Sequence, residues 1–268
     1  MFIISKGVTL LTIIIQFIAT VLLAFLLLGC IDTSSNYSNI YLFNYKFNSS
    51  SSLYQHLTLD SNSTSTTNSS STSSTSILDS DLSKISVKVG YLALCLSAND
   101  LQQCTSYTNL QSIPQLTITF LETKFNLLNI AQTFHSSIVH SHLLMASIIL
   151  TLATLVILCY LILPISFGAS IMKRIGLLLT FINMMLWGLG SMLQHQSVNA
   201  TTKLLSGASF EVVQVSRGQR AETMTWVAFS FLIVVFLSFV MMNYVAMKNS
   251  RAAEKDRISD NRGYMEKV

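Results

Sequence analysis

Two cysteines carry the clearest chemistry in this sequence. Cys95 and Cys104, with eight residues between them, lie in the stretch VGYLALCLSANDLQQC, which otherwise does not resemble an active site. In an oxidising compartment two such thiols form a disulfide by default. Closing a loop of this size stabilises a fold by somewhat under about 3 kcal/mol. The prediction therefore depends on which side of a membrane the two cysteines occupy.

The other candidate groups favour structural roles over catalysis. His135, His140 and His142 form the cluster HSSIVHSH, but no carboxylate or cysteine is spaced to complete a metal site, so we interpret them as polar residues at a helix end. Asp79 and Asp81 lack the following glycine and distal glutamate of a calcium loop. No nucleophile elbow, zinc-protease motif or phosphate-binding glycine loop occurs. We expect no catalytic residues, metal, cofactor or nucleic-acid partner, and therefore no enzyme.

Long uncharged runs place the chain among membrane proteins. Of its residues 51% are hydrophobic and only 10% are charged, whereas soluble domains carry roughly 25% charged residues. Four runs, residues 8–30, 138–163, 175–195 and 223–247, each hold about 20 apolar-dominated residues, enough to cross a hydrocarbon core about 30 Å thick. Because backbone amides in lipid must bond internally, we expect four helices.

Two other interpretations of the first run compete with a membrane anchor. Lys6 precedes it as in a signal peptide, but its apolar stretch is too long and no small-residue cleavage site follows. The sequence LLGC at residues 27–30 also resembles a lipoprotein site, which three further runs and the glycosylation signals argue against. We interpret the run as an uncleaved anchor helix.

Polar groups inside the runs are expected to be structural. Cys30 and Cys159 lie in the first and second runs near opposite faces of the bilayer, so we expect them to stay unpaired and buried. Asn183 and Asn243 lie at or near membrane depth, where an amide more often joins two helices than binds a ligand.

Positive charge predicts the orientation of the spans. Lys6 precedes the first, Lys173 and Arg174 occupy the turn between the second and third, and a basic tail follows the fourth. Since cytoplasmic loops are enriched in such residues, we expect both termini to be cytoplasmic, although the second outer loop also holds three cations. The predicted segments outside the spans are the N-terminus 1–7, the extracellular loop 31–137, the cytoplasmic loop 164–174, the extracellular loop 196–222 and the cytoplasmic tail 248–268.

Glycosylation signals agree with this orientation. The sequon Asn-x-Ser/Thr occurs at Asn36, Asn48, Asn62, Asn68 and Asn199, all in predicted outer loops. Within the first loop, residues 49–76 form a Ser/Thr-rich insert that holds too few apolar side chains to fold. We interpret the insert as a disordered spacer, open to O-glycosylation.

Alternating residues in the first outer loop predict a small antiparallel sheet. Residues 40–47 and 85–91 alternate with a period of two, and the second of these strands runs on into Cys95. Residues 116–120 predict a third, shorter strand, and the changed spacing over 121–130 predicts a helix. Gly90 interrupts the second strand, where the lack of a side chain permits a bulge or a close approach by another backbone.

The segment around the two cysteines resembles a known motif. In the claudin-like tetraspan superfamily, the first extracellular loop carries glycine, two apolar residues, glycine, any residue and cysteine, followed by a second cysteine. A fungal family within it, described as calcium regulators and membrane-fusion proteins induced by mating pheromone, uses a Gly-Tyr-Leu/Phe-Gly-x-Cys form. This sequence reads Gly90, Tyr91, Leu92, Ala93, Leu94 and Cys95, with Cys104 as the second cysteine. The tyrosine favours the fungal family over animal claudins, whereas Ala93 departs from the expected glycine and would not suit a positive φ.

The resemblance implies both a fold and a function. The fold is a mainly α membrane protein, a claudin-like four-transmembrane-helix bundle with a small extracellular antiparallel β-sheet braced by the Cys95–Cys104 disulfide and packed through Tyr91, Leu92 and Leu94. The function is regulation of calcium influx and promotion of cell fusion during mating, at the plasma membrane of the cell-contact or mating-projection zone. Its partners would be the lipid bilayer and a membrane protein such as a calcium channel, or a second copy of the chain. The alternatives are a structural tetraspan that organises plasma-membrane domains or cell wall, and a channel in its own right.

Overall fold

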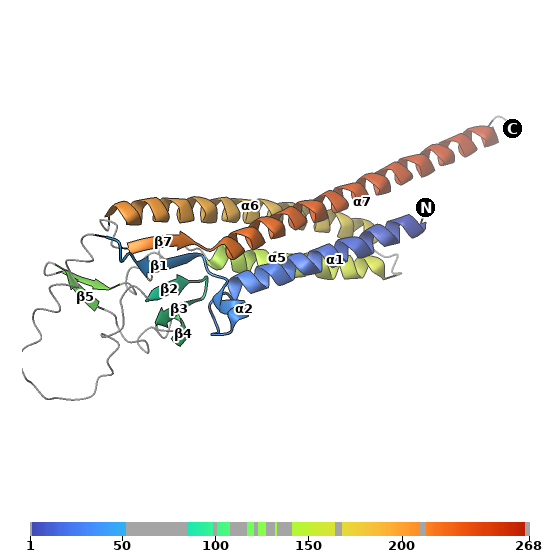
Figure 1. Ribbon diagram of the computed structural model, residues 1–268. Coiled ribbons are helices and arrows are strands. Elements are labelled where there is room, and N and C mark those ends of the chain that lie inside the picture. Colours follow the sequence, from blue (N-terminus) through green and yellow to red (C-terminus); the bar gives the residue numbers. More distant parts are fainter. Residues whose placement is uncertain are drawn as a thin grey trace, which may run out of the picture. The chain divides into compact units, whose positions relative to one another are not determined.

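The fold combines long helices with two small antiparallel sheets (Figure 1). The computed structural model describes residues 2–51, 85–98, 101–107, 117–120, 123–126, 132, 141–163, 168–208 and 213–265. The helices are α1 (Phe2–Leu27), α2 (Ser35–Ser38), α5 (Ser141–Ile162), α6 (Ala169–Ala208) and α7 (Gln219–Met265). The strands are β1 (Phe43–Phe47), β2 (Ser86–Val89), β3 (Ala93–Ala98), β4 (Leu101–Ser106), β5 (Thr117–Phe120), β6 (Thr123–Asn126) and β7 (Val213–Arg217).

The chain divides into two compact units. Unit 1 contains Met1–Leu22, Met145–Leu189 and Trp226–Val268. Unit 2 contains Leu23–Leu144 and Gly190–Thr225. Unit 1 is therefore built from helices, whereas every described strand belongs to unit 2.

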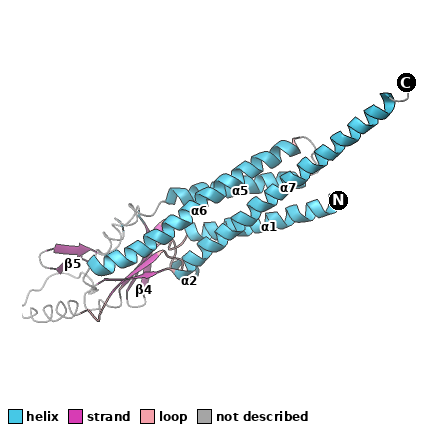
Figure 2. Ribbon diagram, turned by 90° about the horizontal axis from the view of Figure 1, so that it is seen from above, coloured by secondary structure: helices cyan, strands magenta, loops and turns pink. Residues whose placement is uncertain are grey.

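Four helices are long and apolar enough to cross a membrane, which confirms the predicted four-span fold. The candidate spans are Gly7–Leu27, Ser141–Ile162, Ala169–Leu204 and Gln219–Ala252. Within unit 1 the four helices run alongside one another, as two perpendicular views agree (Figures 1 and 2). With 40 residues, α6 is about 60 Å long, about twice the thickness of a hydrocarbon core. It therefore extends beyond the lipid layer.

The length of α6 changes two expectations. Lys173 and Arg174 were expected in the turn before the third span, but they lie inside α6, which begins at Ala169. Much of the segment expected as the second outer loop is also helical, since α6 continues to Ala208. Residues 169–208 contain no proline and no strong helix stop. The helix therefore continues past the end of the apolar run.

Each helix of unit 1 turns one narrow stripe inward. The stripe residues recur at alternating spacings of three and four, the period that keeps one helix face on its partners. All of them are buried: Thr9, Thr12, Gln16 and Ala19 on α1; Ser147, Thr151, Thr154 and Leu158 on α5; Gly176, Thr180, Asn183 and Trp187 on α6; Ala228, Leu232, Val235 and Phe239 on α7. Hydroxyl and amide side chains therefore occur in the stripes of α1, α5 and α6, whereas the stripe of α7 is apolar.

Side-chain amides join the helices of unit 1. Gln16 Nε2 donates to the Thr154 hydroxyl at 2.7 Å and to the Thr151 carbonyl at 3.0 Å, which ties α1 to α5. The Ser147 hydroxyl donates to Asn183 Oδ1 at 2.8 Å, which ties α5 to α6. Such bonds contribute about 0.6 kcal/mol each on average. The expectation that polar residues at membrane depth join helices is confirmed.

Bonding at Gln16 is incomplete. Its amide nitrogen has two acceptors, but Oε1 is buried without a hydrogen-bond partner in the described part of the chain. An unbonded acceptor in a low-dielectric interior is costly. The polar layer therefore specifies which helices meet more than it stabilises the bundle.

A further contact, late in the bundle, joins α7 to α6. Asn243 Nδ2 donates to the Lys173 carbonyl at 3.0 Å and to the Phe239 carbonyl of its own helix at 2.9 Å. Close to it, Gly176 lets the Phe239 ring lie directly on the α6 backbone. Phe239 also packs with Leu158 and Val235 in a buried cluster, so this end of unit 1 is closely packed.

The thiol of Cys159 does not take the buried position expected for it. Cys159 is exposed on α5, although it directly follows the fully buried Leu158. One residue turns a helix by about 100°, so a neighbour of an inward position faces away from the partners. The cysteine therefore lies on the outer face of its helix.

Unit 2 contains a five-stranded antiparallel sheet with the order β4-β3-β2-β1-β7. The strands β1, β2 and β5 correspond to the three predicted ones, but the second ends at Val89 instead of continuing to Cys95, and a turn separates it from β3. The edge strand β7 comes from the segment before α7, where Val213 and Val215 alternate with Gln214 and Ser216.

A second, two-stranded sheet corrects the helix expected over residues 121–130. Phe125 lies in β6, which pairs with β5 in a hairpin. The rest of β6 also falls within the expected helix, and residues 121, 122 and 127–130 lie outside the described segments. Four residues of strand contain only two repeats of period two, which is too few to distinguish from helical spacing.

Replacing Gly176 tests the packing of unit 1. In Gly176→Leu the new side chain would overlap the buried Phe239 ring, and overpacking of this kind costs about 1–3 kcal/mol. The matched control is Gly7→Leu on α1, where nothing lies within 4 Å of the added Cβ. Thermal unfolding in detergent should show a lower midpoint for the first variant only. Equal midpoints would contradict this packing.

Candidate functional site

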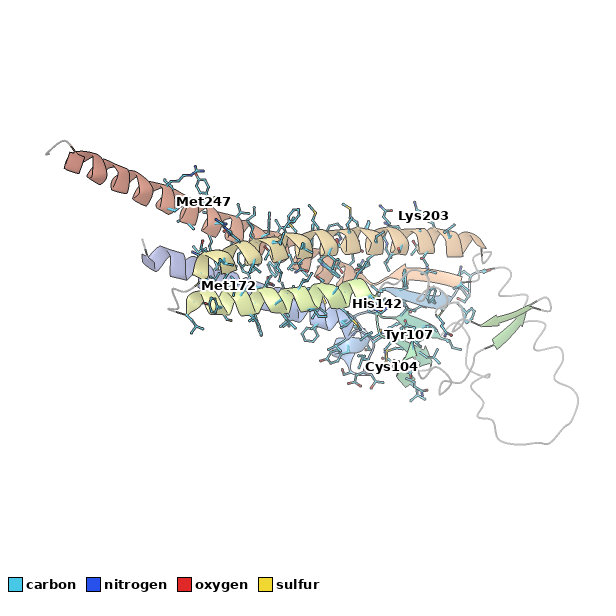
Figure 3. All side chains as sticks on the ribbon, turned by 180° about the vertical axis from the view of Figure 1, so that it is seen from behind. Cys104, Tyr107, His142, Met172, Lys203 and Met247 are labelled. Carbon is cyan, nitrogen blue, oxygen red and sulfur yellow. A yellow bond between two sulfur atoms is a disulfide. The ribbon has the colours of Figure 1, made fainter. Side chains whose placement is uncertain are left out.

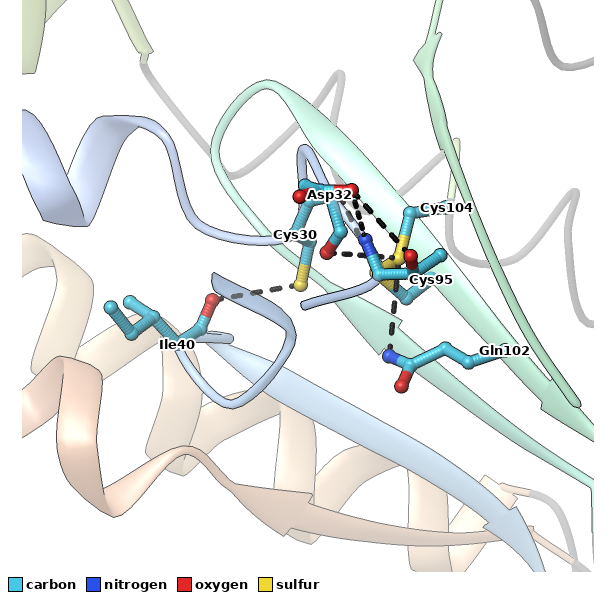
Figure 4. Close-up of a disulfide and its surroundings, with 7 residues drawn as sticks. Cys30, Asp32, Ile40, Cys95, Gln102 and Cys104 are labelled. Carbon is cyan, nitrogen blue, oxygen red and sulfur yellow. Dashed lines mark hydrogen bonds between the residues drawn. A yellow bond between two sulfur atoms is a disulfide. The ribbon is translucent and has the colours of Figure 1, made fainter. Parts of the chain in front are cut away.

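The predicted cysteine pair forms a disulfide across two neighbouring strands. Cys95 in β3 and Cys104 in β4 are directly opposite one another in the register and are bonded (Figure 4). A bridge at opposed positions fixes both the pairing and the register of the two strands. Since β4 is an edge strand of the described sheet, the bridge holds in place a strand that pairs with only one neighbour there.

Backbone from the segment after α1 covers the bridge. Cys95 Sγ lies 3.4 Å from the Cys30 carbonyl oxygen, and Cys104 Sγ lies 3.5 Å from the Asp32 carbonyl oxygen. On the other side Gln102 Nε2 points at Cys104 Sγ from 3.9 Å (Figure 4). The bridge is therefore enclosed by polar backbone, with Cys95 fully buried and Cys104 partly so.

Cys30 is a buried free thiol beside the bridge. It packs with Ala93 and Cys95, and its thiol points at the Ile40 carbonyl, 3.5 Å away (Figure 4). Burial raises the pKa of Cys30 to about 12. The thiol is therefore protonated at neutral pH and inert toward the neighbouring disulfide. The expectation that it is buried and unpaired is confirmed, but it lies three residues beyond the end of α1.

Residues 90–92 form the turn between β2 and β3, here called the motif turn. The Gly90 N–H donates to the Ala93 carbonyl at 2.9 Å, which closes it. A Cβ on Gly90 would lie 2.5 Å from the Gly29 carbonyl oxygen and 3.1 Å from Cys30 Cβ. No side chain fits in that space. The expectation that Gly90 admits a second backbone is confirmed, and that backbone belongs to Gly29.

The alanine that departs from the family motif causes no backbone strain. Among the described residues other than glycine only Cys30 has a positive φ, 65°, so Ala93 adopts an ordinary strand conformation. Its methyl group packs between Cys30 and Cys95. Leu94 is fully buried, whereas Leu92 is half-buried. Alanine at this position therefore fills a gap that glycine would leave.

Tyr91 anchors the motif turn to two helices. Its ring is buried, and its hydroxyl donates to Gln194 Oε1 on α6 at 2.8 Å. The Thr225 hydroxyl on α7 reaches the same oxygen at 3.2 Å. Burial raises the pKa of Tyr91, so the hydroxyl stays protonated and remains a donor. One amide oxygen thus links the sheet to residues of two helices within unit 2.

A second polar cluster lies next to this anchor. His195 Nδ1 is 2.9 Å from Glu222 Oε1, and His195 Nε2 is 3.0 Å from Asn199 Nδ2. These contacts fit a neutral ring that donates from Nδ1 and accepts at Nε2. Because both groups are about one-third exposed, the pair contributes little to stability. It does hold the side chain of Asn199 against the helix.

The face of the sheet that carries the bridge is basic. Lys88 in β2 lies directly opposite both Cys95 in β3 and Asn44 in β1, with its ammonium 5.4 Å from the centre of the Tyr41 ring. Burial lowers the pKa of Lys88, and the positive charge of Lys46 lowers it further. Two cations therefore repel one another across neighbouring strands.

The end of β4 packs back onto the motif turn. The Tyr107 hydroxyl donates to the Gly90 carbonyl at 3.1 Å, and Figure 3 shows Tyr107 beside the strand that carries Cys104. Burial raises the pKa of Tyr107. The motif turn is thus held by a tyrosine of its own and by the tyrosine that directly follows β4.

The sheet therefore gathers the motif residues in one place, but other expected groups lie elsewhere. Asn199 is on a helix, not in a loop, and His142 is exposed at the start of α5 (Figure 3). Asn62, Asn68, His135 and His140 lie outside the described residues. Within the described segments no group of three His, Cys, Asp or Glu side chains could hold a metal ion.

Three elements of the site were not foreseen from the sequence. Gly29 and Gln194 have no local pattern that marks them as partners of residues 60 or more positions away. The strand β7 had a usable signal, since Val213 and Val215 alternate with polar residues. Among the described residues the arrangement is a covalently braced sheet.

Comparison with known proteins agrees with this geometry. The family described as Ca2+ regulator and membrane fusion protein Fig1 matches residues 69–245, which include the bridge, the motif turn and β7. The Factor-induced gene 1 protein of Saccharomyces cerevisiae (strain ATCC 204508 / S288c) is 27% identical over 271 residues. That similarity covers 91% of this chain and 85% of the yeast protein.

Removing the Tyr91 hydroxyl tests the anchor. Tyr91→Phe deletes the bond to Gln194 but keeps the buried ring, and should lower the free energy of unfolding by about 1 kcal/mol. Tyr37→Phe is the matched control, since no hydrogen bond from its hydroxyl is found in the described part of the chain. Thermal unfolding in detergent separates the two, and a midpoint unchanged in both variants would show that the anchor is not made.

Proposed function

The chain belongs to the Fig1 family of Ca2+ regulator and membrane fusion proteins, and from this premise we propose that it regulates calcium influx and promotes cell fusion at the plasma membrane of mating cells. The observation that supports this proposal most is the braced sheet, because the family match contains its bridge and its motif turn. The sheet is the recognition surface, and the helices anchor it in the bilayer.

The orientation that we propose puts the sheet outside and both termini in the cytoplasm. A disulfide persists in an oxidising compartment, which supports an outer position for Cys95 and Cys104. Lys173, Lys248 and Arg251 lie toward the opposite ends of the apolar runs, as the positive-inside rule requires of cytoplasmic residues. The proposed segments outside the spans are thus those predicted from charge.

The chain acts as a regulator, not as a pore or an enzyme. A calcium-selective pore needs a ring of acidic side chains at its constriction. The apolar runs 8–30, 138–163, 175–195 and 223–247 contain no Asp or Glu. The buried layer of unit 1 holds hydroxyls and amides that bond one another. Calcium entry would therefore pass through a partner, such as a channel in the same membrane.

The edge of the sheet offers the contact for such a partner. β4 is an outermost strand in the described sheet, and its residues alternate between exposed and half-buried along most of its length, with Leu101 80% exposed. An edge strand presents unpaired backbone donors and acceptors to another chain. The bridge keeps this edge in register with β3, so the surface presented is constant. A channel subunit or a second copy of the chain would pair with it.

Breaking the bridge tests the proposal. In Cys95→Ser/Cys104→Ser the edge strand loses a constraint worth somewhat under about 3 kcal/mol, so calcium uptake and fusion of mating cells should both be lost. Cys159→Ser is the control, because that thiol is free and exposed on α5. Calcium-45 uptake and mating efficiency in pheromone-treated cells are the readouts.

Two outcomes would overturn this function. Normal uptake and normal mating in the double serine variant, delivered to the cell surface, would remove the role of the bridged sheet. Constitutive, static membrane patches of the tagged chain that ignore pheromone would instead favour the structural alternative, an organiser of membrane domains or wall.

A further inference from the structure

We propose that Asn48 is an N-glycosylation site of the bridged sheet and that the sequons at Asn36 and Asn199 stay unmodified. All three match the same three-residue pattern, so sequence alone does not separate them. In the structure the three sequons differ in backbone conformation and in the burial of their third residue. The inference rests on the outward placement in the proposed function, because oligosaccharide transfer occurs on that side of the membrane.

The sequon at Asn48 already has its asparagine folded toward the residue two positions on. Asn48 directly follows β1, and its Oδ1 accepts a hydrogen bond from the Ser50 N–H at 3.1 Å. This is an Asx turn, in which side chain and following backbone approach one another. Ser49 and Ser50 are exposed, and Asn48 is half-buried. The amide nitrogen and the Ser50 hydroxyl can therefore be reached together.

Asn48 lies at the end of the sheet opposite the motif turn. β1 begins at Phe43, opposite Val89, the last residue before the motif turn, and ends at Phe47, opposite Val213. Asn48 thus lies at the end of the central strands away from the motif turn, roughly 16 Å along a five-residue strand. A glycan there is also about three strand spacings, or about 14 Å, from the edge strand β4. It would cover one end of the sheet without covering that edge.

The sequon at Asn199 lies inside α6. Successive helix residues are turned by about 100°, so Asn199 and Thr201 point about 160° apart, on nearly opposite sides of the helix. Thr201 is only 1% exposed, and its hydroxyl donates to the Ser197 carbonyl at 2.7 Å. Asn199 Nδ2 is occupied by His195 Nε2 at 3.0 Å. Both groups that define the sequon are therefore engaged on different sides of one helix.

The sequon at Asn36 is limited by its third residue. It lies in the short helix α2, and Ser38 is only 3% exposed. The Ser38 N–H donates to the Ser34 carbonyl at 3.0 Å, which holds Ser38 in the helical turn. The Tyr37 carbonyl accepts from the Cys30 N–H at 3.0 Å. This segment is thus fixed against the residues that cover the bridge.

The oligosaccharide that is transferred to Asn48 Nδ2 comes from a lipid-linked donor, which is the co-reactant. The bond between C1 of the sugar and the oxygen of its lipid diphosphate carrier breaks, and a C1–Nδ2 bond forms on Asn48. The amide loses one proton, and the carrier leaves as its diphosphate. The product is a solubilising group on the surface of the sheet.

The test is a gel-mobility assay of the full chain in a glycosylating host. Asn62→Gln/Asn68→Gln serves as the background, and Asn36→Gln, Asn48→Gln and Asn199→Gln are added singly, with and without endoglycosidase. Only Asn48→Gln should remove one glycan step and abolish the endoglycosidase shift. A remaining shift after Asn48→Gln, or a shift lost with Asn36→Gln or Asn199→Gln, would overturn the proposal.

Two conservative variants separate loss of the sequon from loss of folding. Ser50→Ala keeps Asn48 and the backbone donor of the Asx turn but should remove the glycan, whereas Ser50→Thr should keep it. If Asn48 carries no glycan, the glycans of the wild-type protein distinguish two causes. Glycans at Asn62 or Asn68 without one at Asn48 would refute this inference alone, while a chain without any glycan would also refute the outward placement in the proposed function.

Discussion

A close backbone contact in unit 2 joins Gly90 to Gly29, and the bridged sheet depends on it. With a side chain on Gly90 the Gly29 carbonyl oxygen would be only 2.5 Å from the new Cβ, and a side chain on Gly29 would overlap the backbone of Ile40. Two bare residues therefore let the segment after α1 pass against the motif turn. That passage puts Cys30 against Cys95 and encloses the disulfide. The bridge, the turn and the covering segment form one structure.

The two units are stabilised by different interactions. In unit 1, short side chains along heptad stripes let helices approach, and amides of Gln16 and Asn183 specify which helices meet. In unit 2, the backbone ladder, one covalent bond and the Tyr91 anchor hold the strands. A sheet fixed in this way presents the same edge to every partner. This suits the recognition role that we propose for the sheet.

The sequence predicted best what depends on length and composition. Four spans follow from apolar runs, and the pairing of Cys95 with Cys104 follows from their position in one loop that charge predicts to be extracellular. The sequence failed where a partner is distant. Tyr91 bonds Gln194, 103 positions away, and no local periodicity encodes that pairing. Short elements failed as well, since β6 holds only four residues and was taken for helix.

Hydrogen exchange on Gly90→Ala in lipid nanodiscs tests the central claim most directly. The added methyl group should separate the motif turn from Gly29. Protection from exchange should then fall together at the Gly90 and Leu42 amides and along β2, β3 and β4. The amides of α5 should stay protected. Ala93→Gly, which removes a methyl from the first residue of β3 and creates no close contact, should leave the sheet protected. Loss of protection confined to Gly90 and its immediate neighbours, with β3 and β4 unchanged, would contradict the account.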